Sequence, residues 1–352
     1  MMRVLMTTDA VGGVWHYALE LAAALDADVV LAVLGPAPDP DQRMAAEAAG
    51  VRLVDTGLPL DWLSDGPAPV LAAADALARL ARDMGADLVH LNAPALAVAR
   101  FDMPVVAVNH GCLGTWWDAA RGGAVDAGLA WLPDLVGQGL RAADRVLTPT
   151  RAYAEATARH YGLPLPLAVH NGRTALPLPD AQPFPGALTV GRLWDEAKDT
   201  ATLDAAAALL DAPFVAIGAT RAPHGATVAP QHLQATGPLP PEIVGHWLAR
   251  RPVFASAARF EPFGLAVLEA AQAGCPLVLS DIPTFRELWD GAATFVTPGD
   301  AQGFADAIAA ALADPAQGQA ARRRAARYTP AATAAAMTEI YRDALSRRTQ
   351  AA

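Results

Sequence analysis

The sequence predicts an α/β protein of two doubly wound domains that face a cleft. Short apolar runs without polar alternation, such as residues 29–35 and 105–111, are typical of parallel strands covered on both faces. Alanine- and leucine-rich helical stretches separate these runs, and strand–helix alternation with short connections favours a doubly wound sheet. The pattern restarts after a proline-rich stretch near the middle of the chain, which predicts a second domain.

The predicted elements fall into two sets on either side of that stretch. In the first set, strands are expected at residues 3–8, 29–35, 88–92, 105–111 and 145–150, and helices at 15–25, 70–84 and 151–160. In the second set, strands are expected at residues 187–193, 213–218, 253–256, 276–281 and 293–300, and helices at 200–210, 241–250, 301–312 and 330–345. A further helix is expected within residues 260–274, with its start near residues 263–265.

The proline-rich stretch is LPLPDAQPFPG, residues 176–186, and its prolines predict a linker. We therefore expect an N-terminal domain over residues 1–175 and a C-terminal domain over 187–328. The helical segment over 329–352 can cross back to the N-terminal domain.

Length, composition and charge restrict the class of protein. A chain of 352 residues suits two domains, and 53% hydrophobic with 18% charged residues supports a large core. A net charge of −10 argues against a nucleic-acid binder that relies on broad positive potential. No apolar run approaches the roughly 20 residues that span a bilayer. We expect a cytoplasmic protein, with weak contact to a membrane surface left open and with Cys112 and Cys275 as free thiols.

Two carboxylates bracket an apolar segment in FEPFGLAVLEAAQAG, residues 260–274. The proline and glycine place the start of a helix near residues 263–265, so Glu261 belongs to the preceding loop and Glu269 to the helix. The amides of Phe263, Gly264 and Leu265 then carry the positive end of the helix dipole. Carboxylates suit hydroxyl-rich ligands and amides suit anions. The alternative is a capping acid followed by an ordinary surface acid, although the apolar neighbours of Glu269 predict partial burial.

A second segment, TVGRLWDEAKD at residues 189–199, places Arg192 and Lys198 at the mouth of a strand. Lys198 is the only lysine of the chain. Two cations beside a turn can hold a diphosphate, each charge-assisted bond contributing roughly 1.5–3 kcal/mol. The alternative is a helix-entry ion pair in which Asp195 or Glu196 takes Lys198.

These two segments resemble the signatures of retaining glycosyltransferases of family 4. The resemblance covers almost the whole chain and implies the GT-B fold of two Rossmann-like domains. It implies that Glu261 bonds the hydroxyls of the donor sugar, that Glu269 holds the ribose and that the amides of residues 263–265 touch the donor. It also implies that Arg192 and Lys198 neutralise the leaving nucleoside diphosphate. Asp199 departs from the family pattern, which often has glycine there, and an acid at this position could weaken the phosphate site.

A glycine pair, Gly12 and Gly13, lies between the first predicted strand and its helix. The pair does not fit the dinucleotide pattern GxGxxG, but it lets a phosphate approach the backbone at a helix start. The resemblance implies a loop that closes over the donor phosphates and the acceptor. A plain tight turn is the alternative.

His110 ends a predicted strand in VNHGCLGTWW, residues 108–117. A single histidine is more often structural, and the resemblance implies a place near the 6-position of the donor sugar. Trp116 and Trp117 could stack on a sugar or on an apolar acceptor, and packing in the core or in a lid fits them equally well.

The strings Asp39-Pro40-Asp41 and Asp26-Ala27-Asp28 match a DxD pattern, but neither has a supporting histidine or third acid. We interpret both as solvated turns and expect neither a metal nor another cofactor.

The resemblance implies a hexosyltransferase of glycan biosynthesis. The expected reaction is a retaining, metal-independent transfer from a UDP-, GDP- or ADP-sugar, with UDP weakly favoured, to a glycan, glycolipid or small-molecule acceptor. The alternatives are a sugar-nucleotide epimerase of the same fold and a degenerate nucleotide-sugar-binding subunit.

Overall fold

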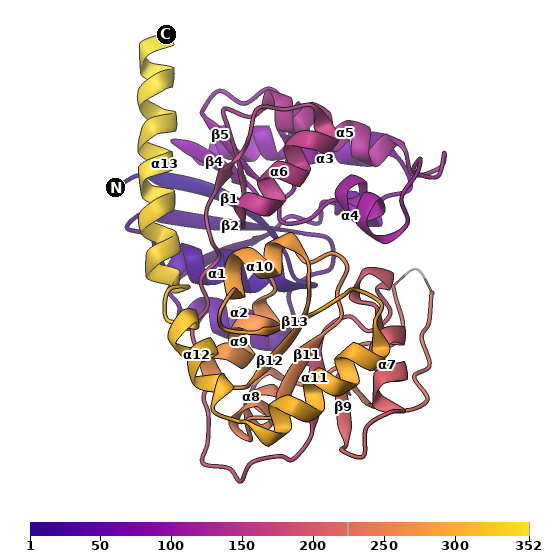
Figure 1. The fold of residues 1–352 in the computed structure, drawn as a ribbon. Coiled ribbons are helices and arrows are strands. Elements are labelled where there is room, and N and C mark those ends of the chain that lie inside the picture. The colour runs from indigo at the N-terminus through magenta and orange to yellow at the C-terminus, as the bar shows by residue number, and fades with distance from the viewer. Residues whose placement is uncertain (224, 352) are drawn as a thin grey trace. The chain divides into compact units, whose positions relative to one another are not determined.

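The computed structural model describes residues 1–223 and 225–351. The chain divides into two compact units, each with its own sheet (Figure 1). The first unit comprises Met1–Arg173 together with Thr329–Ala352, and the second comprises Thr174–Tyr328. The end of the chain therefore belongs to the unit that contains its beginning.

The first unit is built on a parallel sheet of seven strands in the order β3-β2-β1-β4-β5-β6-β7. The strands are β1 (Arg3–Asp9), β2 (Asp28–Leu34), β3 (Arg52–Asp55), β4 (Leu88–Leu91), β5 (Val105–Val108), β6 (Arg145–Thr148) and β7 (Leu167–Ala168). The strand order reverses between β1 and β4. In open sheets of this kind, ligands bind beyond the carboxyl ends of the strands at such a point.

Helices cover both faces of this sheet. They are α1 (Gly13–Ala24), α2 (Pro40–Ala48), α3 (Pro67–Asp83), α4 (Leu113–Ala120), α5 (Trp131–Ala142), α6 (Arg151–Tyr161) and α13 (Pro330–Ala351), with the short 3₁₀ helices η1 (Asp61–Leu63) and η2 (Pro94–Val98). Alternate residues of β1 divide between two cores: Leu5 packs with the core that contains α3 and α5, and Met6 with the core that contains α1 and α13. Figure 1 shows α13, in yellow, alongside the strands of this unit.

The second unit has six parallel strands in the order β10-β9-β8-β11-β12-β13. They are β8 (Ala187–Val190), β9 (Phe214–Ile217), β10 (Gln234–Gly237), β11 (Val253–Ser256), β12 (Leu277–Ser280) and β13 (Thr294–Val296). The helices are η3 (Glu196–Lys198), α7 (Thr200–Ala207), α8 (Pro241–Ala249), α9 (Leu265–Ala273), α10 (Pro283–Trp289), α11 (Ala301–Ala313) and α12 (Gln317–Ala325). The order reverses between β8 and β11, and α9 packs in the core on one face of the sheet.

The predicted doubly wound α/β fold is confirmed, and every predicted strand is present. Several elements without a strong apolar pattern were not predicted, among them the half-exposed edge strand β3 and the polar helix α2. The interpretation of Asp39 as part of a solvated turn is wrong, because its carboxylate accepts the Gln42 amide at 2.8 Å and caps α2. No helix among the described residues is long and apolar enough to cross a bilayer.

Candidate functional site

A pocket opens in the second unit where the strand order reverses. Its walls come from the carboxyl ends of β8 and β11, the loop that follows each strand, and the start of α9. The lining includes Thr189, Gly191, Lys198, Ser256, Glu261 and Val267. The sequence placed Lys198 and Glu261 at the ends of two strands far apart in the chain. The sheet brings them into one pocket because β8 and β11 are neighbours.

Lys198 and Glu261 form an ion pair in this pocket. The ammonium of Lys198 donates to Oε2 of Glu261, and the two side chains are 22% and 19% exposed. The alternative in which Lys198 pairs with an acid of its own turn is therefore wrong. The cation and the carboxylate present charge-assisted donor and acceptor groups side by side, a combination that suits a ligand with both anionic and hydroxyl groups.

Arg192 lies at the rim of the same strand end and is more exposed. Its guanidinium pairs with Asp195 at 3.0 Å and lies 5.6 Å from the centre of the Trp194 ring. Because 56% of the side chain is exposed, a ligand can reach the guanidinium without disturbing the core. Asp195 is buried, and its second oxygen accepts the Ala197 amide at 3.0 Å.

Asp199 follows Lys198 in a left-handed backbone conformation, with φ of +50°. This conformation favours glycine and tolerates aspartate, which is consistent with glycine being common there in the family. The buried carboxylate of Asp199 pairs with Arg259 at 2.9 Å and accepts from the Thr202 amide at the start of α7. A guanidinium thus faces this carboxylate, which lowers the repulsion expected toward a phosphate.

The start of α9 is shaped by Gly264, which has φ of +88°. A Cβ atom there would lie 3.2 Å from Cγ of Glu261 and 3.3 Å from the Phe285 ring. Phe263 is buried with its ring edge-on to Tyr328, and the helix proper begins at Leu265. The backbone of residues 263–265 is thereby fixed beside Glu261. Ala266 and Val267 of the first turn of α9 line the pocket, so the positive end of the helix dipole lies at the pocket.

Glu269 lies in the second turn of α9 and is partly buried, as the sequence predicted. Its neighbours Val267, Leu268 and Ala270 are all buried. Glu269 does not line the pocket itself. Glu261 therefore lies at the pocket, in the loop before α9, and Glu269 lies further along the helix.

The reversal point of the first unit carries the glycine pair. Oδ1 of Asp9 accepts hydrogen bonds from the amides of Val11 at 2.8 Å and Gly12 at 3.0 Å. Gly12 is extended, with φ of −147°, and α1 begins at Gly13. The Gly12 amide therefore points to a carboxylate in this conformation, and a phosphate would meet Gly13 and the first turn of α1 instead.

A hydrogen-bonded group of side chains lies between β4 and β5 beside this loop. Oδ1 of Asn92 lies 2.9 Å from Nε2 of His90 and 2.8 Å from Nε2 of His110, and Nδ1 of His90 lies 2.6 Å from the hydroxyl of Tyr341. Burial lowers the pKa of His90 to about 4 and that of His110 to about 3, so both imidazoles are neutral. Sequence reasoning singled out His110 alone. The histidine and asparagine of LVHLN, at a strand end, were a signal for the others.

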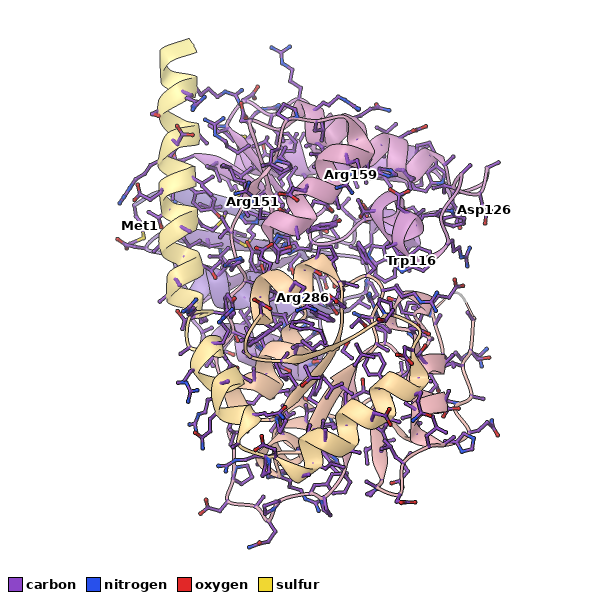
Figure 2. The ribbon with its side chains drawn as sticks, viewed as in Figure 1. Met1, Trp116, Asp126, Arg151, Arg159 and Arg286 are labelled. Atoms are coloured by element: carbon purple, nitrogen blue, oxygen red, sulfur yellow. The ribbon has the colours of Figure 1, made fainter. Side chains whose placement is uncertain are left out.

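The two tryptophans of α4 differ in accessibility. Trp117 is 4% exposed. The guanidinium carbon of Arg121 lies 4.6 Å from the centre of the Trp117 ring. Of the two alternatives for Trp117, this burial favours packing in the core over stacking on an acceptor. Trp116 is partly exposed on the same helix (Figure 2).

Among residues 1–223 and 225–351, no group of three or more histidine, cysteine or acidic side chains is placed to hold a metal ion.

Sequence comparison assigns both halves of the chain. Residues 11–172 match the family model described as Glycosyltransferase Family 4, and residues 185–314 match that of Glycosyl transferases group 1. The glycogen synthase of Mycobacterium tuberculosis is 30% identical over 386 aligned residues, which cover 93% of this chain and 89% of that protein. The chain belongs to family 4 of the glycosyltransferases.

Solved structures of other glycosyltransferases share the fold. The sucrose-phosphate synthase of Thermosynechococcus elongatus has a TM-score of 0.78 at 19% identity, over 99% of this chain and all of that one. HepE of Anabaena in complex with UDP-glucose has a TM-score of 0.74 at 18% identity, over 97% of this chain and all of that one. At these identities the likeness establishes the GT-B fold alone.

The predicted family and fold are thus confirmed. The glycosyltransferase is a hexosyltransferase that uses a nucleotide-sugar donor. The roles of its individual residues, including Glu261, Lys198 and His110, stay predictions.

Proposed function

We propose that this glycosyltransferase transfers a hexose, with retention of configuration and without a metal ion, from a nucleoside diphosphate sugar to a sugar-containing acceptor. We propose that the diphosphate end of the donor binds in the pocket of the second unit. The observation that carries the proposal is the pairing of Lys198 with Glu261 beside the start of α9. The pocket combines a cation, a hydroxyl acceptor and a helix dipole where doubly wound sheets bind ligands.

The charges of the pocket define the proposed chemistry. When the bond between the sugar and the diphosphate breaks, negative charge grows on the departing phosphate. Lys198, Arg192 and the amides at the start of α9 stabilise that charge in a partly buried site. The phosphate oxygen then takes the proton of the attacking acceptor hydroxyl on the same face of the sugar, so the new bond forms where the old one breaks.

The carboxylates and the histidine hold the donor in this proposal. Glu261 accepts hydrogen bonds from the hydroxyls of the donor sugar, and Glu269 accepts hydrogen bonds from the ribose hydroxyls. His110 accepts a hydrogen bond from a hydroxyl of the transferred sugar. Glu261 is paired with Lys198 and positions the sugar rather than acting as the general base.

The donor is proposed to be UDP-glucose. HepE of Anabaena binds UDP-glucose, and starch synthase IV of Arabidopsis binds ADP and acarbose. Both share this fold, so ADP-glucose is the competing donor. Trp116 offers a partly exposed ring for a sugar acceptor, in keeping with the stacking that aromatic rings provide.

The test uses a panel of UDP-, ADP- and GDP-glucose. Thermal stabilisation measures the binding of each donor. Product formation with mono- and oligosaccharide acceptors, with and without EDTA, measures transfer. A ligand at about 100 times its Kd should stabilise the protein by ~2.7 kcal/mol. We expect one nucleotide to stabilise the wild type and not Lys198→Ala, EDTA to change nothing, and NMR of the product to show the anomer of the donor.

Four results would contradict the proposal. Loss of activity in EDTA with recovery on adding a divalent ion would exclude metal independence. An inverted product would exclude retention. Binding without transfer or hydrolysis for every donor would favour a degenerate subunit, and conversion of the sugar without an acceptor would favour an epimerase.

A further inference from the structure

The hydrogen bonds around Asn92 determine where the protons of two histidines lie. The Nδ2 group of Asn92 donates to the backbone carbonyl of Thr7 at 2.7 Å. A carbonyl can only accept, so the amide orientation is fixed and Oδ1 must face the two imidazoles. Because Oδ1 can only accept as well, both Nε2 of His90 and Nε2 of His110 must carry a proton.

The far end of the group agrees with this assignment. A neutral imidazole with its proton on Nε2 has a bare Nδ1. Nδ1 of His90 lies 2.6 Å from the hydroxyl of Tyr341, which is fully buried on α13 and can donate to it. The chain of donors therefore runs from Tyr341 to His90 to Asn92 without a conflict.

His110 differs from His90 at the same atom. Its Nδ1 has no hydrogen-bond partner among residues 1–223 and 225–351, and the side chain is partly exposed. The ring lies against that of Tyr17 on α1, at 4.4 Å between centres and an angle of 64°. Asn92 and Tyr17 thus hold the imidazole from two sides, and a lone pair on Nδ1 is left for a ligand.

We propose that Asn92 is a positioning residue that holds His110 in the Nε2–H tautomer, so that Nδ1 acts as an obligate acceptor for a hydroxyl group of the transferred sugar. The ligand part of this inference rests on the proposed function, whereas the tautomer does not. A fixed acceptor favours a sugar with a hydroxyl group facing Nδ1. It disfavours a sugar whose group at that position can only accept hydrogen bonds, and a sugar that lacks a polar group there.

Titratable neighbours of His110 support a neutral ring. They are His90 from β4 and Tyr17 from α1, and burial raises the pKa of Tyr17 above its usual range. Neither provides a negative charge that would hold a proton on Nδ1. Replacing Asn92 by aspartate would introduce that charge while preserving the shape of the side chain, and it would raise the pKa of His110.

The tautomer is measured directly by ¹⁵N NMR of the full chain with labelled histidine, the His110 signals being assigned by their absence in His110→Gln. We expect the proton on Nε2 in the wild type and in Tyr341→Phe, which removes one hydrogen bond of the group but leaves Asn92 intact. We expect a mixture of tautomers in Asn92→Leu. A proton on Nδ1 of wild-type His110, or an unchanged signal in Asn92→Leu, would overturn the inference.

Asn92→Asp provides a second measurement, which also serves if Asn92→Leu does not fold. We expect its His110 to be doubly protonated near neutral pH and its kcat/KM to fall at least about tenfold, relative to wild type, between roughly pH 9 and pH 6. A loss of the same size at every pH would indicate a merely structural role and would overturn the proposal. If no nucleotide sugar is a substrate, the proposed function fails while the NMR result still decides the tautomer.

Discussion

The ammonium of Lys198 contacts the carboxylate of Glu261, although 63 positions separate the two residues in the sequence. Each residue follows a different strand, and the neighbouring strands β8 and β11 end at the same edge of the sheet. The pair is about four-fifths buried, so each charge depends on the other. Loss of one partner leaves a poorly solvated charge, which is more costly than loss of both.

The first prediction concerns this pair. Lys198→Ala should lower kcat/KM by roughly 100- to 1000-fold, because it removes a charge that stabilises the departing phosphate. The double variant with Glu261→Ala should lose less than the sum of the two single losses, with a coupling of about 1–3 kcal/mol. Steady-state kinetics measure all four proteins.

Arg286 and Asp281 provide the matched control, because this pair lies on the surface of the same unit with both side chains more than two-fifths exposed (Figure 2 labels Arg286). Arg286→Ala should leave kcat/KM within about twofold of wild type. Additive losses for Lys198 and Glu261, or an equal loss for Arg286→Ala, would contradict the assignment.

The second prediction separates the two glutamates of the α9 segment. Glu269→Ala should weaken binding of the free nucleotide more than Glu261→Ala does, since only Glu269 is assigned to the ribose. A lost hydrogen bond to a charged group costs about 1.5–3 kcal/mol, or roughly 10- to 150-fold in Kd. Calorimetry with UDP and with UDP-glucose makes the comparison, and Glu242→Ala, at an exposed position of α8, is the control. Equal losses would refute the division of roles.

The third prediction concerns Gly264. Gly264→Ala should lower the free energy of unfolding by about 2–4 kcal/mol, because it combines a left-handed backbone with close contacts to Glu261 and Phe285. Gly299→Ala shares the positive φ, at +83°, but its Cβ would meet Arg259 only at an ordinary 3.7 Å. Urea denaturation of both should show a clearly larger loss for Gly264→Ala. A similar loss in both would mean that backbone strain alone matters there.

The fourth prediction is a dependence of stability on pH. Burial lowers the pKa of His90 to about 4, whereas an unfolded histidine has a pKa of about 6.5. The unfolded state therefore binds a proton first. His90 contributes stability that is complete above the unfolded pKa and is lost as the pH falls from about 6.5 to about 4, by ~1.4 kcal/mol per pH unit.

Asp61 acts in the opposite direction, because burial raises its pKa to about 6. Its contribution to the free energy of unfolding therefore grows as the pH falls below that value. The comparison must therefore be made between wild type and His90→Gln rather than on the wild type alone. Urea midpoints between roughly pH 7.5 and pH 4.5 should show a shallower decline for the variant. Parallel declines would show that His90 does not titrate as its burial requires.

The sequence predicted the strand–helix alternation and both motif segments because these patterns are local. An apolar run of four to seven residues predicts a buried strand wherever it lies. The proline and glycine before Leu265 predicted the helix start to within two residues. The partial burial of Glu269 followed from its apolar neighbours in the same helix. Helix α2 and strand β3 escaped prediction because their residues are largely exposed and carry little apolar pattern.

The sequence by itself determined the fold class, the family and the residue types of the candidate site. The tertiary structure decided which of those side chains meet. Lys198 pairs with Glu261 rather than with an acid of its own turn. Asp9 accepts a hydrogen bond from the Gly12 amide, and Trp117 is buried. The tertiary structure also joined His90 to Tyr341 on α13, 251 positions away in the sequence. Such contacts depend on the order of strands in a sheet and on where a distant helix packs, and neither leaves a periodic signal in the residues concerned.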